Sequence, residues 1–191
     1  MEYLEVSAAD ACMIQESRTL GDASRAAERG AKRAKWDMAV NDVVATDAGS
    51  TSAGVAIAAR CHVGLGADDA VQPPGEYASR VAVRWLGGYA RGGLHLVSVY
   101  FWHTEQLSAR NLDLMQVVAG IVRGLDGPWI IAVDFNMPPD VVRGSGWLAL
   151  LGGEIAASGQ PTCKGHEIDY AVAPRVLMPE VVAVVPVVVA G

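Results

Sequence analysis

The sequence predicts an α+β fold in which two or three helices accompany a mixed β-sheet. Three observations support this class. Strand-like apolar stretches outnumber helical ones, those in the middle follow one another through turn-rich breaks as antiparallel hairpins do, and one helical segment joins two buried strands between residues 93 and 134. The length of 191 residues fits one domain, and the hydrophobic content of 51% can build a packed core.

The first half of the chain is predicted to be mostly β-structure. Residues 10–16 begin as a short apolar run and end in polar residues, which indicates a buried strand. Asp22 is a candidate N-cap for a helix over about residues 23–35. Turn-rich breaks at residues 47–52 and 64–75 interrupt the segment that follows. The strand-like stretches of this segment cover residues 36–45, 53–60, 79–86 and 93–101.

The second half alternates helices and strands. Apolar residues recur at helical spacing over residues 108–123, and Ser108 is a good N-cap for this helix. Pro128 introduces a buried strand over residues 129–133, and Pro138-Pro139 ends the regular structure that follows it. The remaining predicted elements are a short helix at about residues 144–151, a strand at about 167–173 and a strand-like stretch at 180–190.

Composition excludes several classes of protein. The longest apolar run, Val181 to Ala190, is half of the roughly 20 residues that a membrane-spanning helix needs, and it contains Pro186. The acidic start differs from the basic start of a secretory signal, so we expect a soluble, intracellular protein of the cytoplasm or nucleus. The three cysteines lack CxxC spacing, which argues against a disulfide framework and a structural zinc site. A net charge of −6 argues against non-specific nucleic-acid binding through bulk charge.

Three acidic residues share one feature, which is that each lies at the end of an apolar strand or just inside one. They are Glu16, Asp134 and Asp169. If these strand ends converge, their carboxylates form a site of hard oxygen ligands that suits Mg²⁺ or Mn²⁺. The alternative for each is an acidic residue that only closes a turn.

The segment Asp134-Phe135-Asn136 carries more information. Its two polar side chains alternate around an aromatic residue, so both can point to one face. An aspartate can orient or deprotonate a water molecule that attacks a phosphate ester, and an asparagine can donate a hydrogen bond to a phosphoryl oxygen. The alternative is an Asx-type turn that leads into the two prolines.

Four short motifs together resemble the endonuclease/exonuclease/phosphatase superfamily, the DNase I-like proteins. They are Met13-Ile14-Gln15-Glu16, Ser98-Val99-Tyr100, Val133-Asp134-Phe135-Asn136 and Ile168-Asp169-Tyr170, in the family's order and approximate spacing. The resemblance covers nearly the whole chain. It implies one domain over residues 1–191 with the fold of this family, a four-layer α/β sandwich.

The resemblance also implies a role for each motif residue. Glu16 resembles the family's metal-ligand glutamate, and Asp134 resembles the residue that positions or activates the water. Asn136 resembles the residue that contacts the phosphate, and Tyr100 the one whose hydroxyl approaches it. Asp169 resembles the carboxylate that orients a catalytic histidine. The implied cofactor is Mg²⁺ or Mn²⁺.

The chain departs from the family pattern at both ends, so we expect the fold to be incomplete there. Only Met1 to Ala9 precede the first predicted strand, where the family has an additional strand with an asparagine. The family's C-terminal histidine motif is also missing, because no histidine follows His166. Either Pro186-Val187 belongs to that motif, with Val184 in the place of the histidine, or the final apolar stretch is the strand before it. The second interpretation is favoured.

The function expected from these residues is divalent-metal-dependent phosphodiester hydrolysis, most similar to that of a nuclease. The alternative is an inactive or truncated domain of the same fold that binds a partner or has no function of its own. The expected substrate is nucleic acid or another phosphodiester, and the sequence does not identify a protein partner. Candidate substrate-binding and cleft residues are His103, His166, Arg143, Lys164, Arg175 and Trp102.

Overall fold

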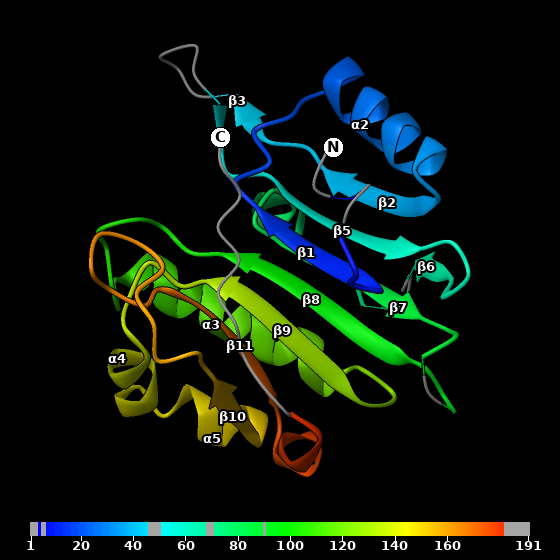
Figure 1. Cartoon of the computed structure of the whole chain (residues 1–191). Helices are drawn as coiled ribbons and strands as arrows, with labels where there is room; N and C mark the ends of the chain where they lie inside the picture. Colours follow the sequence, from blue (N-terminus) through cyan, green and yellow to red (C-terminus); the bar gives the residue numbers. More distant parts are fainter. Residues whose placement is uncertain (1–3, 5–6, 46–50, 68–70, 90, 182–191) are drawn as a thin grey trace.

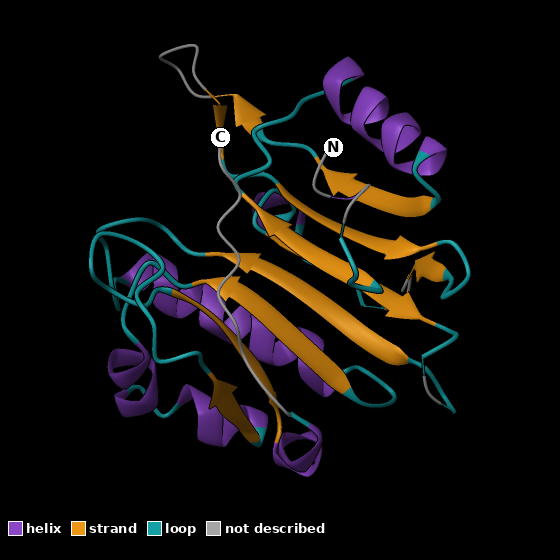
Figure 2. Cartoon of the chain, in the orientation of Figure 1, coloured by secondary structure: helices purple, strands orange, loops and turns teal. Residues whose placement is uncertain are grey.

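The computed structural model, which describes residues 4, 7–45, 51–67, 71–89 and 91–181, is a four-layer α+β structure. Two β-sheets face each other, and helices cover the outer face of each sheet (Figure 1 and Figure 2). Three clusters of buried apolar residues fill the spaces between the four layers. The predicted α+β class and the four-layer arrangement are confirmed.

The smaller sheet has three antiparallel strands in the order β1-β5-β2. Helix α2 packs on its outer face through a cluster that includes Ala31 and Trp36. A two-stranded ribbon of β3 and β4 lies beside this sheet. The bounds of these elements are β1 Ala11–Gln15, α2 Asp22–Arg33, β2 Trp36–Asn41, β3 Val44–Ala45, β4 Thr51–Ser52 and β5 Val55–Arg60.

The larger sheet has six strands in the order β10-β11-β9-β8-β7-β6. All neighbours are antiparallel except β8 and β9, which are parallel and are joined by helix α3. This confirms the predicted β-α-β crossover. The strand bounds are β6 Leu65–Ala67, β7 Val81–Leu86, β8 Leu94–Tyr100, β9 Trp129–Asp134, β10 Gly153–Ala156 and β11 Asp169–Pro174. The helices are α3 Ala109–Arg123, α4 Pro139–Gly144 and α5 Trp147–Leu151, with single 3₁₀ segments η1 Gly75–Tyr77 and η2 Arg175–Glu180.

Strand β8 is buried along its whole length because it contributes to two cores at once. Leu96 and Tyr100 face the smaller sheet, whereas Val97 and Val99 pack in the cluster that contains α3. Successive side chains of a strand point to opposite faces of the sheet. A strand that is covered on both faces therefore has apolar side chains at nearly every position. This explains the nearly continuous apolar run of the sequence.

The two predicted helix starts have different outcomes. Ser108 is the N-cap of α3, and its hydroxyl accepts a hydrogen bond from the Asn111 backbone at 3.3 Å. Asp22 does not cap α2, which corrects the prediction, because Asp22 is the first helical residue and Gly21 precedes it. The Asp42 carboxylate serves the helix start instead, accepting from the Gly21 N–H at 3.2 Å and the Ser24 hydroxyl at 2.5 Å.

Several predicted boundaries also differ from the structure. The helix expected at 144–151 is α5, Trp147–Leu151, and a helix that the sequence did not predict, α4, precedes it; Pro139 opens α4 rather than ending the regular structure. Proline is well suited to that position because its missing N–H would have no helical partner there. The short strands β6 and β10 lie in regions where no strand was predicted. The strand expected at 180–190 lies outside the described residues beyond position 181.

Candidate active site

Three predicted site residues form one row across the larger sheet. Asp134 at the end of β9 pairs in register with Tyr100 at the end of β8 and with Asp169 at the start of β11. Side chains at paired positions point to the same face of a sheet. Tyr100 packs in the cluster between the two sheets, so the row faces the smaller sheet.

Glu16 lies opposite this row, directly after β1 of the smaller sheet. The Tyr100 hydroxyl donates a hydrogen bond to Glu16 Oε1, and the Arg18 guanidinium lies 3.0 Å from Glu16 Oε2. Burial raises the pKa of Tyr100, and the hydrogen bond to Glu16 raises it further, so the phenol stays protonated as a donor. The two sheets therefore bring Glu16, Tyr100, Asp134 and Asp169 together at one end of the sandwich.

The turn after β1 is held in shape by Gly54. Glu16 has a left-handed backbone with φ 53°, and the N–H of Ser17 donates to the Gly54 carbonyl at 3.0 Å. Gly54 has φ 89°, and a Cβ there would lie 2.5 Å from Ser17 Oγ. Only glycine fits this position without displacing the segment that carries Glu16.

The carboxyl of Asp134 has a higher pKa than an ordinary aspartate. Burial raises the pKa of its carboxyl to about 7, and the negative charges of Asp169 and Glu16 add to this effect. Burial also raises the pKa of Asp169, against a hydrogen bond from the Thr162 side chain. A carboxyl with a pKa near neutrality can both hold and release a proton at working pH, as a general base must.

Asn136 is placed by a local turn. Its backbone N–H donates to Asp134 Oδ1 at 3.0 Å, which is the Asx-type turn that the sequence left open. Asn136 has φ 52°, a conformation that asparagine tolerates better than most residues. Its Nδ2 donates to the Phe101 carbonyl at 3.1 Å, and its Oδ1 lies 2.7 Å from His103 Nδ1. The turn therefore holds Asn136 beside Asp134. An Asx-type turn at this segment is compatible with a site that uses both polar side chains.

Gln15 ties the two sheets together beneath the site, a role that the sequence did not indicate. Its Nε2 donates to Ser98 Oγ at 2.9 Å and to the Ala132 carbonyl at 3.1 Å. Ser98 Oγ in turn donates to the Ile14 carbonyl at 3.2 Å. The residue before Glu16 is thus bonded to both β8 and β9, which fixes β1 relative to the strands that carry Tyr100 and Asp134.

We expect Gln15→Met, which keeps the length of the side chain but removes both donors, to lower the free energy of unfolding by about 1–3 kcal/mol. The reason is that the Ala132 carbonyl loses a partner and β1 loses its link to β8 and β9. Chemical denaturation measures the change. Gln116→Met on the exposed face of α3 is the matched control, with an expected change within about 0.5 kcal/mol. Equal stability of the two variants would contradict the role given to Gln15.

The donors at this site fit a single Mg²⁺ or Mn²⁺ ion. No cluster of three or more histidine, cysteine, aspartate or glutamate side chains suited to a metal occurs within the described ranges. Mg²⁺ is nevertheless often held by one or two carboxylates, with waters and substrate phosphates as its other ligands. Burial is the main cause of the raised pKa values of Asp134 and Asp169, and neighbouring carboxylates add to it, so a bound cation would favour the ionised form of both groups.

The other candidate residues are distributed over several places. His103 contacts Asn136, and Lys164 and His166 lie in the loop before Asp169. Arg143 and Arg175 instead line a separate cavity of about 480 Å³ beside α5, and each forms an ion pair with a nearby acid. Trp102 packs against the guanidinium groups of Arg80 and Arg110, whose carbons lie 3.9 and 4.6 Å from its ring centroid. This packing fixes the position of the Trp102 ring on the loop.

None of the described helices is long and apolar enough to cross a membrane. No protein-family model matches the sequence, and the search of curated proteins found no match.

Solved structures, in contrast, resemble this chain over most of its length. The AP endonuclease LMAP from Leishmania major has a TM-score of 0.63 and 14% identity, with 92% of this chain and 73% of that chain covered. The human Nocturnin catalytic domain with bound sulfate has a TM-score of 0.60 and 16% identity, covering 87% and 69%. ANGEL2, a 2′,3′-cyclic phosphatase, has a TM-score of 0.59 and 13% identity, covering 91% and 72%. These proteins belong to the superfamily that the motifs resemble, so the chain has the DNase I-like fold of the endonuclease/exonuclease/phosphatase superfamily.

Proposed function

We propose that this chain is a divalent-metal-dependent phosphodiester hydrolase, most similar to a nuclease. The observation that carries the proposal is the meeting of Glu16, Tyr100, Asp134 and Asp169 between the two sheets, with the pKa of Asp134 raised to about 7. A shared fold alone would not support this activity, because one fold hosts many functions. The chemistry of the site and the similar solved structures both support this proposal, since the solved structures include an endonuclease and a cyclic phosphatase.

Each side chain has a part in the proposed reaction. Asp134 orients the attacking water and accepts its proton, and Asn136 donates a hydrogen bond to a phosphoryl oxygen. The Tyr100 hydroxyl, held by Glu16, is a second donor toward the phosphate. Asp169 raises the proton affinity of Asp134 through its charge. Glu16 would hold the Mg²⁺ or Mn²⁺ ion, which when bound neutralises charge on the phosphoryl oxygens.

The proposal predicts that removal of metal abolishes hydrolysis. We expect the chain to cleave bis(4-nitrophenyl) phosphate in millimolar Mg²⁺. In EDTA the rate should be at least about 100-fold lower, and it should recover when Mg²⁺ is added back in excess. Release of 4-nitrophenol measures the rate. The monoester 4-nitrophenyl phosphate serves as the comparison, and it should be cleaved more slowly by a diester hydrolase.

Two results would count against this function. Hydrolysis that is equally fast in EDTA would exclude the metal dependence. Absence of hydrolysis together with Mg²⁺-dependent thermal stabilisation would instead favour the alternative, a binding module of the same fold.

A further inference from the structure

A histidine on the loop after β8 forms a hydrogen bond with the Asn136 amide. The Asn136 Nδ2 donates to the Phe101 carbonyl at 3.1 Å, and a carbonyl oxygen can only accept. The amide nitrogen is therefore on the Phe101 side, and Oδ1 is the atom that lies 2.7 Å from His103 Nδ1. An amide oxygen also only accepts, so His103 Nδ1 must carry the hydrogen of this bond.

These two bonds leave one group of Asn136 available. Its Nδ2 has two hydrogens, and within the described part of the chain it uses one, toward Phe101. The other can donate to a substrate oxygen. If the amide turned by 180°, its oxygen would face the Phe101 carbonyl, and Nδ2 would face His103. The bond to the Phe101 carbonyl and the bond from His103 therefore both keep the Asn136 donor in place.

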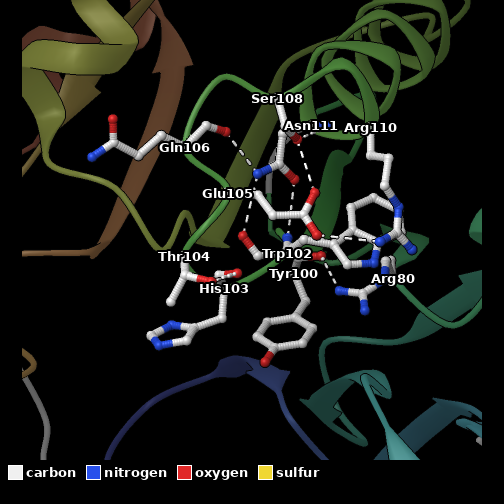
Figure 3. A network of polar contacts seen from close by, with 10 residues as sticks. All are labelled: Arg80, Tyr100, Trp102, His103, Thr104, Glu105, Gln106, Ser108, Arg110 and Asn111. Carbon is white, nitrogen blue, oxygen red and sulfur yellow. Dashed lines mark hydrogen bonds and ion pairs between the residues drawn. The ribbon is translucent and has the colours of Figure 1, made fainter.

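The loop that carries His103 is firmly anchored. Asn111 is fully buried, accepts from the Trp102 N–H at 3.0 Å, and donates to the carbonyls of Trp102 at 3.2 Å and Gln106 at 2.7 Å (Figure 3). The Arg80 guanidinium packs on the Trp102 ring from below the loop and donates to the Tyr100 carbonyl at 3.2 Å. Figure 3 shows the rings of His103 and Tyr100 projecting from this segment toward the same side. His103 is thus an exposed side chain on a fixed backbone.

We propose that His103 is a positioning residue that holds the Asn136 amide through its Nδ1–H, so that Asn136 presents an N–H to the substrate phosphate. This inference rests on the proposed function, because it assigns the amide a substrate oxygen to bind. His103 acts through Asn136 and does not itself touch the phosphate. Its Nε2 has no part in the contact.

Three variants of His103 separate this role from a direct one. An asparagine can place its amide nitrogen where the histidine has Nδ1, whereas a glutamine reaches the place of Nε2. We expect His103→Ala to lower kcat for bis(4-nitrophenyl) phosphate by about 10- to 100-fold, the range expected when a reacting group is misplaced. His103→Asn should recover activity to within about threefold of the unaltered chain, and His103→Gln should not. His62→Ala, at an exposed histidine paired with Asp10, is the control and should leave kcat unchanged.

The opposite pattern of rescue would overturn the proposal. Activity in His103→Gln but not in His103→Asn would mean that Nε2 performs the function. Full activity in His103→Ala would mean that the Asn136 amide needs no support.

The tautomer of His103 gives a readout that needs no turnover. We expect the ¹⁵N chemical shifts of the ring at pH 8 to show hydrogen on Nδ1, and we expect Asn136→Ala to shift the population toward hydrogen on Nε2. Hydrogen on Nε2 in the unaltered chain would overturn the positioning role whatever the activity. An Nδ1–H tautomer in a chain without hydrolysis would support the contact while refuting the proposed function, so the two failures are distinguishable.

Discussion

Asp134→Asn is expected to abolish hydrolysis while it makes the metal-free protein more stable. The asparagine keeps the shape of the side chain and can still accept the hydrogen bond from the Asn136 backbone. It cannot take a proton from water, so we expect a loss of about 10²–10⁴-fold in kcat for bis(4-nitrophenyl) phosphate. Asp140→Asn, at an exposed aspartate paired with Arg143, is the matched control and should keep full activity.

The gain in stability should depend on pH in a defined direction. Because the pKa of Asp134 is raised to about 7 in the folded protein, the folded state holds more protons than the unfolded state between about pH 4 and pH 7. The free energy of unfolding therefore falls as pH rises through this window, and Asp134→Asn removes that loss. At pH 8 in EDTA we expect the variant to be more stable by roughly 2–4 kcal/mol, and at pH 4 the difference should vanish.

Thermal unfolding from pH 4 to 8 measures this difference. The expected rise in Tm at pH 8 is about 5–10 °C for a chain of this size. A variant that is less stable than the unaltered chain at pH 8 would show that the ionised Asp134 carboxylate stabilises the folded state. Such a result would contradict the raised pKa of the Asp134 carboxyl.

Glu16→Gln is expected to have the largest effect on the response to metal. The glutamine can still accept the hydrogen bond from Tyr100, so the contact between the two sheets is retained. It removes the carboxylate that would hold the ion and the partner of Arg18. We expect the Mg²⁺ concentration for half-maximal hydrolysis to rise by about 10- to 100-fold or more, since even indirect support of a metal ligand has effects of this size.

A second glutamate provides a closely matched control for this experiment. Glu154 on β10 is half-exposed and pairs with Arg175 at 3.3 Å, much as Glu16 pairs with Arg18 at 3.0 Å. Glu154→Gln should leave the Mg²⁺ dependence unchanged. If both variants or neither variant shifted the Mg²⁺ dependence, Glu16 would have no special relation to the metal.

Local patterns in the sequence predicted most of the framework that positions the site. The ends of the apolar strands located Glu16, Asp134 and Asp169, because the polar residues at either end of a buried strand lie at the edge of the core. The helix start at Ser108 was visible because its cap is local. The role of Tyr100 came only from the family resemblance, since a tyrosine at a strand end is otherwise a common core-edge residue.

The rest could not be predicted because it depends on contacts between distant residues. The start of α2 is served by Asp42, which is 21 residues from Gly21 in the chain. The bond between His103 and Asn136 joins residues 33 positions apart, and the bonds of Gln15 span 83 and 117 positions. No periodicity in the sequence encodes such pairs.

The most direct test of the site is to locate the ion itself in crystals grown with millimolar Mn²⁺, by anomalous diffraction. We expect a Mn²⁺ peak at coordination distance from a Glu16 carboxylate oxygen, on the side that faces Asp134 and Asp169, and we expect its loss in Glu16→Gln crystals. A peak elsewhere, or none at this position in crystals of the unaltered chain, would contradict the claim that these residues form a divalent-metal site.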